Sequence, residues 1–329
     1  MITLQDIEDI GFFWLQDVPD VLIGQNDTAL DVCVDVNQVT IFEEKIYADE
    51  DGNVVLRNLP DLIEPFFDND EFVDLWINQV QVRVYFSRRS MPWEVNEPGN
   101  FEASLPRLLS VNSCMFCVPG YDVRIPFLLA IKASHVVKIT CYGMNSLGYL
   151  YSEEYSQVLE NSFSKPSVSK LIIQTSDLLA TETMKNMLPV GIVCEFNGRV
   201  MARVQFVQGC YTILKFVNNF NQEQSLAVPG FVKSIPEYDR VVGMVWGKKV
   251  TAVSRETVKY SIECAPVSVD LADQLMDAAA SVQCHVLEGN NFFPVTLDEV
   301  NIEVSDDRTE FCTPKVTFYR SEHAAKLQR

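Results

Sequence analysis

Apolar and polar residues alternate with a period of two along much of this chain, which is typical of half-buried β-strands. The segments with this pattern are residues 30–41, 79–86, 136–142, 200–207, 257–263 and 315–319. Turn-forming dipeptides lie between such segments, at Asp51-Gly52, Pro98-Gly99, Pro119-Gly120, Asn197-Gly198, Pro229-Gly230 and Gly289-Asn290. Short strands broken at these intervals predict a mainly β (α+β) chain, with two β-sandwich or barrel-like domains and few short helices.

The strongest local signal is Asp51-Gly52, which lies between two apolar segments of residues 41–67. A type I′ turn needs residues that tolerate a positive φ, and Asp-Gly suits it well. We therefore expect a hairpin that turns at Asp51 and Gly52. For the same reason, Asn197 and Gly198 predict a second tight hairpin.

Helical periodicity is clearest in residues 268–280. Ser268 can cap the first turn, and Leu271, Leu275 and Ala279 fall at helical spacing on one stripe. This helix should pack against a sheet. Two weaker helical segments are expected at residues 59–66 and 176–187.

A polar, serine-rich stretch at residues 153–169 lacks a continuous apolar face and predicts a domain boundary. The chain is also longer than one typical domain of roughly 100–200 residues. The expected division is an N-terminal arm or first element (1–29), a β-rich domain with an acidic front (30–160), a linker with a short helix (161–195) and a second β-rich domain with one amphipathic helix (196–329).

Residues 1–29 mix apolar side chains with acids, and two interpretations are open. In one, Phe12, Phe13, Trp14 and Leu15 belong to an arm that orders against a neighbouring subunit. In the other, the segment is an ordinary first strand or helix of its domain. Deletion of residues 1–18 separates the two, because only the second interpretation predicts an insoluble product.

The chain has a formal net charge of −19, and the acids are concentrated at the front. Residues 1–100 contain 21 acidic and 5 basic residues, a net charge of −16, which leaves −3 for the remaining 229 residues. Nucleic-acid binding requires a Lys/Arg footprint, so no nucleic-acid partner is expected. The acidic region either docks on a basic partner or is simply solvated.

Compartment signals favour synthesis in a reducing cytoplasm. The nine cysteines are odd in number and are spread through strand-like apolar segments, which is typical of reduced core thiols. No apolar run approaches the roughly 20 residues that span a bilayer, so no membrane insertion is expected. The first residues carry acids where a cleaved secretory signal carries basic residues.

The sequence contains one set of residues that resembles a metal site: Cys114, Cys117, His135 and Cys141. Three thiolates and an imidazole can complete a zinc tetrahedron. The spacing is loose, however, and His135 and Cys141 lie on opposite phases of one strand-like segment. Buried free thiols are the preferred interpretation, and neither a metal nor a cofactor is predicted.

No motif of a known catalytic type is present, and we expect no enzymatic activity. The histidines, His135, His285 and His323, are far apart in the sequence. A cytosolic hydrolase stays open as an alternative, since catalytic groups assemble in space. It requires His135 or His285 to lie in a cleft beside a Cys, a Ser or a carboxylate.

Exposed aromatic residues can bind sugar, and Trp93 is the best candidate for a glycan contact. Pro92 and Pro98 mark its segment as a loop. Trp14, Trp76 and Trp246 look more like core or interface anchors.

Several longer motifs carry a resemblance to a known group of proteins. They are DxDGxVxLRxLxxLIEPFF at residues 49–67, NSCMFCVPGYDVRIPFLL at 112–129, FVNNFNQEQSLAVPG at 216–230, YSIECAPVSVDLADQLMDAAASVQCHVL at 260–287 and FFPVTLDEVNIEVS at 293–305. In this order they resemble uncharacterised structural tail proteins of tailed phages and prophages of Bacteroides-type bacteria. The chain departs from the group's aromatic-Asn-Phe-Gly form at Phe220-Asn221, which affects the expected turn.

The resemblance implies a non-enzymatic virion component, either a tail-tip or baseplate subunit or an adaptor. Such a protein acts as a homo-oligomeric ring, with other virion tail or neck proteins as partners. It is found in the virion, and in the host cytoplasm before assembly. The principal alternative is a receptor- or glycan-binding module at the tail tip.

Overall fold

The computed structural model describes residues 1–67, 70–88, 106–130, 132–163, 166–245, 248–301 and 311–320; for 237–245, 248–257 and 299 it describes the backbone alone. The described residues lie mostly in strands, with four short α-helices, which confirms the predicted mainly β class. Among the described residues, no helix combines the length and the apolar composition that crossing a membrane requires.

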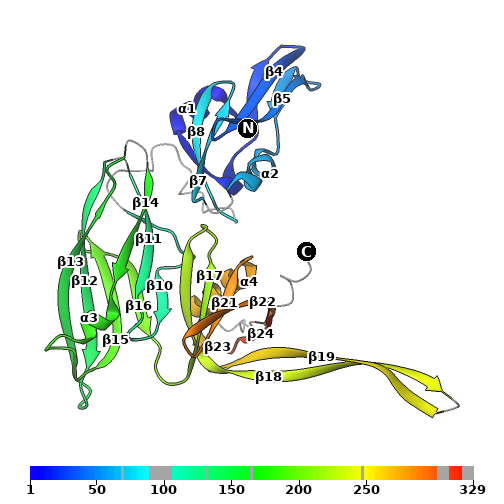
Figure 1. Cartoon of the computed structure of the whole chain (residues 1–329). Helices are drawn as coiled ribbons and strands as arrows, with labels where there is room; N and C mark the ends of the chain where they lie inside the picture. Colours follow the sequence, from blue (N-terminus) through cyan, green and yellow to red (C-terminus); the bar gives the residue numbers. More distant parts are fainter. Residues whose placement is uncertain are drawn as a thin grey trace.

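The N-terminal body, residues 1–88, consists of two sheets around one core (Figure 1). The first has the order β1-β3-β6, with β1 (Ile2–Thr3), β3 (Val21–Gln25) and β6 (Asn53–Leu56). The second has the order β2-β8-β7-β4-β5, with β2 (Phe12–Trp14), β8 (Val80–Tyr85), β7 (Phe72–Ile77), β4 (Ala29–Val36) and β5 (Val39–Tyr47). The helical segments are α1 (Leu4–Ile10), η1 (Leu15–Asp17), α2 (Leu59–Ile63) and η2 (Glu64–Phe66).

The middle body, residues 106–207, is a sandwich of a five-stranded and a three-stranded sheet. The larger sheet has the order β10-β16-β15-β12-β13, with β10 (Cys114–Cys117), β16 (Arg199–Phe206), β15 (Leu188–Phe196), β12 (Ser134–Met144) and β13 (Leu150–Glu160). The smaller has the order β14-β11-β9, with β14 (Ser167–Ile173), β11 (Val123–Leu129) and β9 (Arg107–Leu108). The short helix α3 (Thr175–Leu179) follows β14.

The C-terminal body, residues 211–320, is a closed barrel with one helix against its core. The barrel order is β17-β18-β19-β24-β22-β21, with β17 (Tyr211–Val217), β18 (Glu223–Val245), β19 (Lys248–Cys264), β24 (Lys315–Arg320), β22 (Asn291–Asn301) and β21 (Cys284–Glu288). A two-stranded pair of β20 (Val267–Ser268) and β23 (Phe311–Cys312) flanks the helix α4 (Val269–Ala280).

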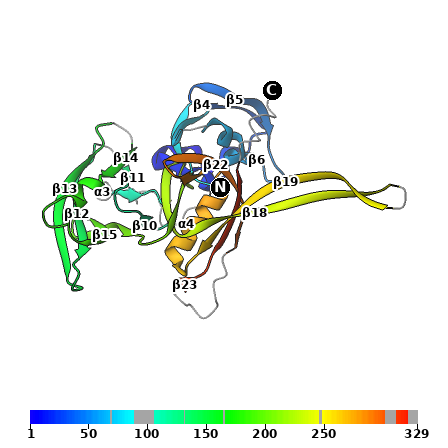
Figure 2. The ribbon, with the colours of Figure 1, turned by 60° about the horizontal axis from the view of Figure 1, so that its bottom comes forward.

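Strands β18 and β19 continue past the barrel as a two-stranded ribbon, defined here as residues 235–245 and 248–259 (Figure 2). Up to Pro229, β18 pairs with β17, and from Tyr260 to Glu263, β19 pairs with β24. Within the described part of the chain, the ribbon strands pair with each other alone. Both outer edges of the ribbon are therefore unpaired with any described strand.

The sequence predicts two domains, whereas the described residues form three large hydrophobic cores. Residues 161–195 are not a linker: they contain β14 and β15, which pair with β11 and β12 of the sandwich. The serine-rich stretch is polar because β13 is an edge strand whose outward positions face solvent. Alternating exposure of this kind resembles a linker in composition but not in hydrogen bonding.

The two predicted hairpins have different outcomes. Strands β15 and β16 turn at Asn197 and Gly198, with φ values of 48° and 75°, as expected for the predicted tight hairpin. At Asp51-Gly52 the chain also reverses, and the Gly52 N–H donates to the Asp49 carbonyl (3.0 Å). The predicted strand pair is nevertheless wrong, because β5 pairs with β4 and β6 pairs with β3.

The reason for this error is a second turn that the pattern concealed. Residues 30–41 are not one strand but the hairpin of β4 and β5, which turns at Asn37 and Gln38 with φ values of 50° and 69°. Strand β5 therefore has β4 as its partner and does not pair with β6, which follows Gly52. Of Asp51 and Gly52, Gly52 alone has a positive φ (77°). A dipeptide can fix a reversal, whereas the burial of apolar faces selects the partner strand.

The predicted helices are largely present. The helix α4 begins after Ser268 and buries Leu271 and Leu275, but Ala279 is exposed and Ala278 lies in the core instead. Residues 59–66 form α2 and η2, as expected. Of residues 176–187, only the part within α3 is α-helical, and the rest continues as turns.

Of the two interpretations of residues 1–29, the structure fits the second, because these residues form the first elements of the N-terminal body. Phe13 and Leu15 are 5% and 0% exposed within its core, so they are unavailable to a partner. Thr3 and Asp6 form a capping box that starts α1, which presents Ile7 to the same core. The segment is therefore the ordinary first part of a domain, as in the second interpretation.

We expect Leu15→Ala to lower the free energy of unfolding by about 2–5 kcal/mol, because it removes a fully buried side chain from a packed core. Chemical denaturation followed by circular dichroism measures this change. The control is Glu8→Ala on the exposed side of α1, expected within about 0.5 kcal/mol of the wild type. Equal stability of the two variants would contradict the assignment of residues 1–29 to the core.

Candidate functional site

The residues proposed for partner contact are divided between two buried clusters, Phe13 and Leu15 in one and Phe12 and Trp14 in the other. Trp93 lies outside the described residues, as do Trp246 and His323. Phe12 is half-buried, and Trp14 is 2% exposed and faces the other two bodies of the same chain. Trp76 is half-buried on the outer face of β7.

The proposed metal ligands are dispersed as well. Cys114 and Cys117 lie on β10, whereas Cys141 and His135 lie on β12, with β16 and β15 between these strands. Burial raises the pKa of the Cys117 and Cys141 thiols to about 11, so both stay protonated near neutral pH. In the described ranges, no group of three or more His, Cys, Asp or Glu residues could hold a metal ion.

The histidines occupy two different environments. His135 is 6% exposed, its ring meets the Phe196 ring edge-on (4.8 Å), and its Nε2 has no hydrogen-bond partner. His285 is half-buried and borders a cavity that also contains Glu223. The described lining of that cavity includes no Ser, Thr or Cys. Its carboxylate, Glu223, is paired with Lys215 (2.7 Å), and the hydrolase alternative stays a prediction.

The loop between β17 and β18, residues 218–222, lies where the three bodies meet, and we call it the junction loop. Asn218 is fully buried and organises the loop. Its Oδ1 accepts hydrogen bonds from the N–H groups of Phe220 (2.9 Å) and Gln222 (3.0 Å). Its Nδ2 donates to the carbonyl of Leu109 in the middle body (3.0 Å). One side chain thus shapes the loop and ties the barrel to the sandwich.

The same loop ties the barrel to the N-terminal body. Asn221 Nδ2 donates to the Asp70 carbonyl (2.9 Å), and the Arg88 N–H donates to the Asn219 carbonyl (3.1 Å). The Arg88 guanidinium donates to the carbonyl of Ala280, the last residue of α4 (3.3 Å). A cation at this end of a helix is favourable, because the helix dipole is negative there.

The departure of the chain from its motif at Phe220-Asn221 does not remove the turn. Asn221 has a φ of 57°, in the left-handed region that glycine favours and asparagine tolerates better than most residues. Its N–H donates to the Asn218 carbonyl (3.1 Å). Asparagine therefore supplies the conformation of glycine and adds an amide that reaches the N-terminal body.

Aromatic side chains pack together where the three bodies meet. Trp14 lies 5.6 Å from Phe220 and 5.8 Å from Tyr85 between ring centroids, and these rings share a buried cluster with Leu109 and Leu128. The five residues come from all three bodies. Aromatic pairs at such distances contribute roughly 0.5–1.5 kcal/mol each beyond the area they bury.

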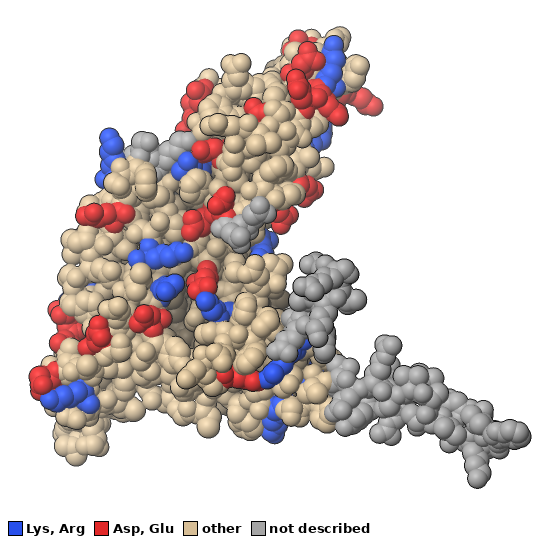
Figure 3. Space-filling model, viewed as in Figure 1, with Lys and Arg blue, Asp and Glu red and all other residues tan. Residues whose placement is uncertain are grey.

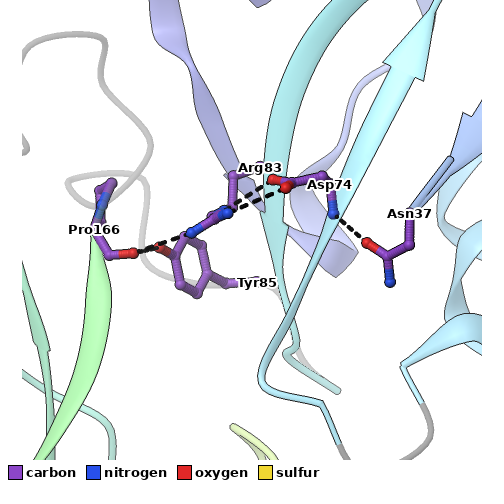
Figure 4. Close-up of polar contacts among 5 residues, drawn as sticks. All are labelled: Asn37, Asp74, Arg83, Tyr85 and Pro166. Atoms are coloured by element: carbon purple, nitrogen blue, oxygen red, sulfur yellow. Dashed lines mark hydrogen bonds and ion pairs between the residues drawn. The ribbon is translucent and has the colours of Figure 1, made fainter. Parts of the chain in front are cut away.

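A polar network lies at the rim of this cluster (Figure 4). Arg83 donates to both carboxylate oxygens of Asp74 (2.9 and 3.1 Å), and Asn37 Oδ1 accepts from the Asp74 N–H (2.9 Å). The Pro166 carbonyl accepts from the Tyr85 hydroxyl (2.8 Å) and from Arg83 (3.4 Å). Burial raises the pKa of Tyr85 far above its ordinary value, so this hydroxyl remains a donor.

A groove runs between the middle body and the barrel. Phe116 and Val118 cover the outer wall of the barrel at Ile213 and Ala227. Lys215 lies two residues farther along β17 on the same face, where Phe116 and Val118 no longer cover the barrel. Cavities adjoin the wall there. Two adjoining cavities share Lys215, Glu223 and Phe292, and together they are the groove. The cavity of about 380 Å³ lies between the two bodies, and the cavity of about 270 Å³ is lined by the C-terminal body.

Charge is unevenly placed on the surface. Acidic side chains gather over the end of the β4–β5 hairpin, as Figure 3 shows, and they include the exposed Asp31, Glu43 and Glu44. The groove instead mixes signs: Lys215 Nζ is 2.7 Å from Glu223, and Arg124 is 4.0 Å from the same carboxylate. The acidic front predicted from composition is thus a property of one end of the molecule.

No protein-family model matches this chain, and no curated protein matches it. The resemblance to phage tail proteins therefore rests on the chain's own motifs. In the fold these motifs supply turns and packing positions, such as Gly52 with its positive φ and the buried Asn218 of the junction loop. Asn218 was not among the predicted site residues. The polar run NNFNQ between two apolar strands was the feature of the sequence that could have indicated it.

We expect Asn218→Ala to lower the free energy of unfolding by about 3 kcal/mol, because it leaves buried N–H groups and a carbonyl without partners. We also expect a larger radius of gyration in small-angle scattering, since the bodies lose a common anchor. Asn186→Ala, at an exposed turn position, is the control and should change neither quantity. An Asn218→Ala chain with unchanged stability and radius would refute the anchoring role.

The buried imidazole of His135 should make the stability of the fold depend on pH. Burial lowers the pKa of His135, so the unfolded chain binds a proton more readily than the folded chain. Stability should therefore decrease as the pH falls from about 7.5 to 5.5, through the ordinary histidine pKa of roughly 6.5. His135→Leu should flatten this dependence, whereas the control His285→Leu leaves His135 in place and should keep it. Denaturant melts at each pH provide the test, and an unchanged slope in His135→Leu would overturn the assignment.

Proposed function

We propose that this protein is a structural subunit of a tailed phage or prophage particle, acting without catalysis in the assembly of the tail, baseplate or adaptor region. The observation that carries the proposal is the ribbon of β18 and β19. At roughly 3.3 Å per residue, residues 235–245 of the ribbon extend about 35 Å. The resemblance of the sequence motifs points to the same class of protein.

An isolated two-stranded ribbon is marginally stable in water and presents two open edges. Its described base is also apolar in part, with Ile235 and Val258 at 42% and 36% exposure. A ribbon of this kind gains stability when a neighbouring subunit covers it or pairs with its edges. This favours a role in which the chain is one of many copies in contact.

The rest of the chain gives the ribbon a fixed attachment. The junction loop holds the barrel against both other bodies, so the ribbon has a rigid base. A projecting element that binds elsewhere on an identical copy makes a heterologous contact, which closes into a ring when the rotation permits. A homo-oligomeric ring is accordingly the proposed assembly.

The acidic end of the N-terminal body fits a role in ordering partners. Exposed like charges repel an identical surface and attract a basic one, and this effect sets orientation and association rate more than affinity. We infer that the β4–β5 end contacts a different tail or neck protein rather than another copy of itself. The proposed location is the virion, with the host cytoplasm as the place before assembly.

We expect the wild-type chain to form concentration-dependent ring-shaped oligomers, observed by light scattering and negative-stain imaging. A variant in which an Asn-Gly turn replaces residues 237–257 should stay folded but monomeric, because the barrel strands end before this segment. The control shortens a different exposed hairpin, β12–β13, at residues 146–148, and should assemble as the wild type does.

Protease digestion of the same samples adds a second readout. Cleavage within residues 237–257 should slow as the wild-type concentration rises, since a neighbour then shields the ribbon. The proposal fails if the wild type remains monomeric at all concentrations and its ribbon is cut equally fast throughout. It also fails if the ribbon-shortened variant assembles normally.

A further inference from the structure

The groove between the middle body and the barrel has the dimensions of a ligand site. Its two cavities, of about 380 and 270 Å³, adjoin at Lys215, Glu223 and Phe292. The larger alone falls in the range of roughly 300–1,000 Å³ that small-molecule pockets occupy. Neither the assembly role nor the ribbon requires this hollow.

Two aromatic rings in the groove are exposed. Tyr121 and Phe292 both line the larger cavity, and they are 42% and 38% exposed. They come from different bodies, Tyr121 from the loop before β11 and Phe292 from β22. Exposed rings in a polar hollow offer flat apolar faces to a ring-shaped ligand.

The charged groups in the groove largely compensate each other. Glu223 accepts from Lys215 (2.7 Å) and faces Arg124 (4.0 Å), while Asp122 lines the same cavity. An anionic ligand must compete with Glu223 for these cations, and a cationic ligand must compete with the cations for Glu223. Hydroxyl groups both donate and accept, so a neutral polyhydroxylated ligand can bond to either sign without separating the pairs.

The groove is also held in shape by its surroundings. Thr175 is fully buried; its Oγ1 donates to the Tyr121 carbonyl (2.7 Å) and accepts from the Gly120 N–H (3.0 Å), which fixes the loop that carries Tyr121. On the barrel side, Lys215 stands beside Ser225 and His285 on neighbouring strands. A site that is ordered before binding loses less entropy when the ligand arrives.

We propose that this groove binds a neutral carbohydrate. A sugar ring packs its apolar face on Phe292 or Tyr121, and its hydroxyls exchange hydrogen bonds with Arg124, Lys215 and Glu223. The contacts are those of recognition, with no bond made or broken. This places glycan recognition between the sandwich and the barrel rather than at Trp93, and it holds whether or not the ribbon builds a ring.

The test begins with the full-length protein on an array of neutral and acidic oligosaccharides. We expect retention of one or more neutral glycans, and calorimetric titration of the strongest then gives the affinity. Phe292→Ala and Tyr121→Ala should each weaken binding about tenfold, since each removes a stacking face. Glu223→Gln should keep the fold but alter the hydroxyl contacts, with weaker binding of the same glycan.

The matched controls are Tyr149→Ala and Phe311→Ala, which remove aromatic rings of 64% and 62% exposure away from the groove. Both should bind as the wild type does. The proposal is overturned if no neutral glycan is retained, if only acidic glycans bind, or if Phe292→Ala and Tyr121→Ala bind with unchanged affinity. Circular dichroism of each variant shows that a loss of binding does not come from unfolding.

Discussion

The architecture depends on the buried hydrogen bonds of Asn218 in the junction loop. Its amide group closes the loop upon itself and reaches the carbonyl of Leu109, while Asn221 reaches that of Asp70. These bonds lie beside the cluster around Trp14, where water is largely excluded. A polar pair is strong in such surroundings and costly to break, so the loop selects one arrangement of the three bodies out of many that apolar contact alone would allow.

The outer wall of the barrel differs from place to place: it is packed in one part, forms the groove in a second and continues as the ribbon in a third. Strand β10 covers it at Ile213 and Ala227 and thereby joins sandwich and barrel in one core. Beyond this cover the wall stays open around Lys215, where the two bodies form the groove. Farther along the same strands, β18 and β19 leave the barrel as the ribbon. The position of β10 therefore decides where the wall is packed and where it is hollow.

Local features could be predicted from the sequence to the extent that they depend on neighbouring residues. Alternation located β8, β12, β16, β24 and part of β19, Asn197-Gly198 located a tight hairpin, and Ser268 marked the start of α4. Pairing between distant strands could not be predicted, because β6 joins β3 through buried apolar faces that many strands share. The groove residues Arg124, Lys215 and Glu223 look like ordinary surface charges in the sequence. Lys215 and Glu223 meet on the paired strands β17 and β18, and the packing of the middle body against these strands brings Arg124 of β11 beside them.

The sequence predicts two domains where the structure has three bodies, and the reason is again that distant contacts leave no local signal. A polar, serine-rich segment is compatible with a linker or with an edge strand, and β13 is the second because its hydrogen-bond partner is β12. Conversely, the true meeting point of the bodies, NNFNQ, is only five residues long and reads as a surface turn. Its burial arises because Trp14, Tyr85 and Phe220 come from different bodies and exclude water jointly. A junction built from such distant residues leaves little trace in local composition, although it determines where both the ribbon and the groove lie.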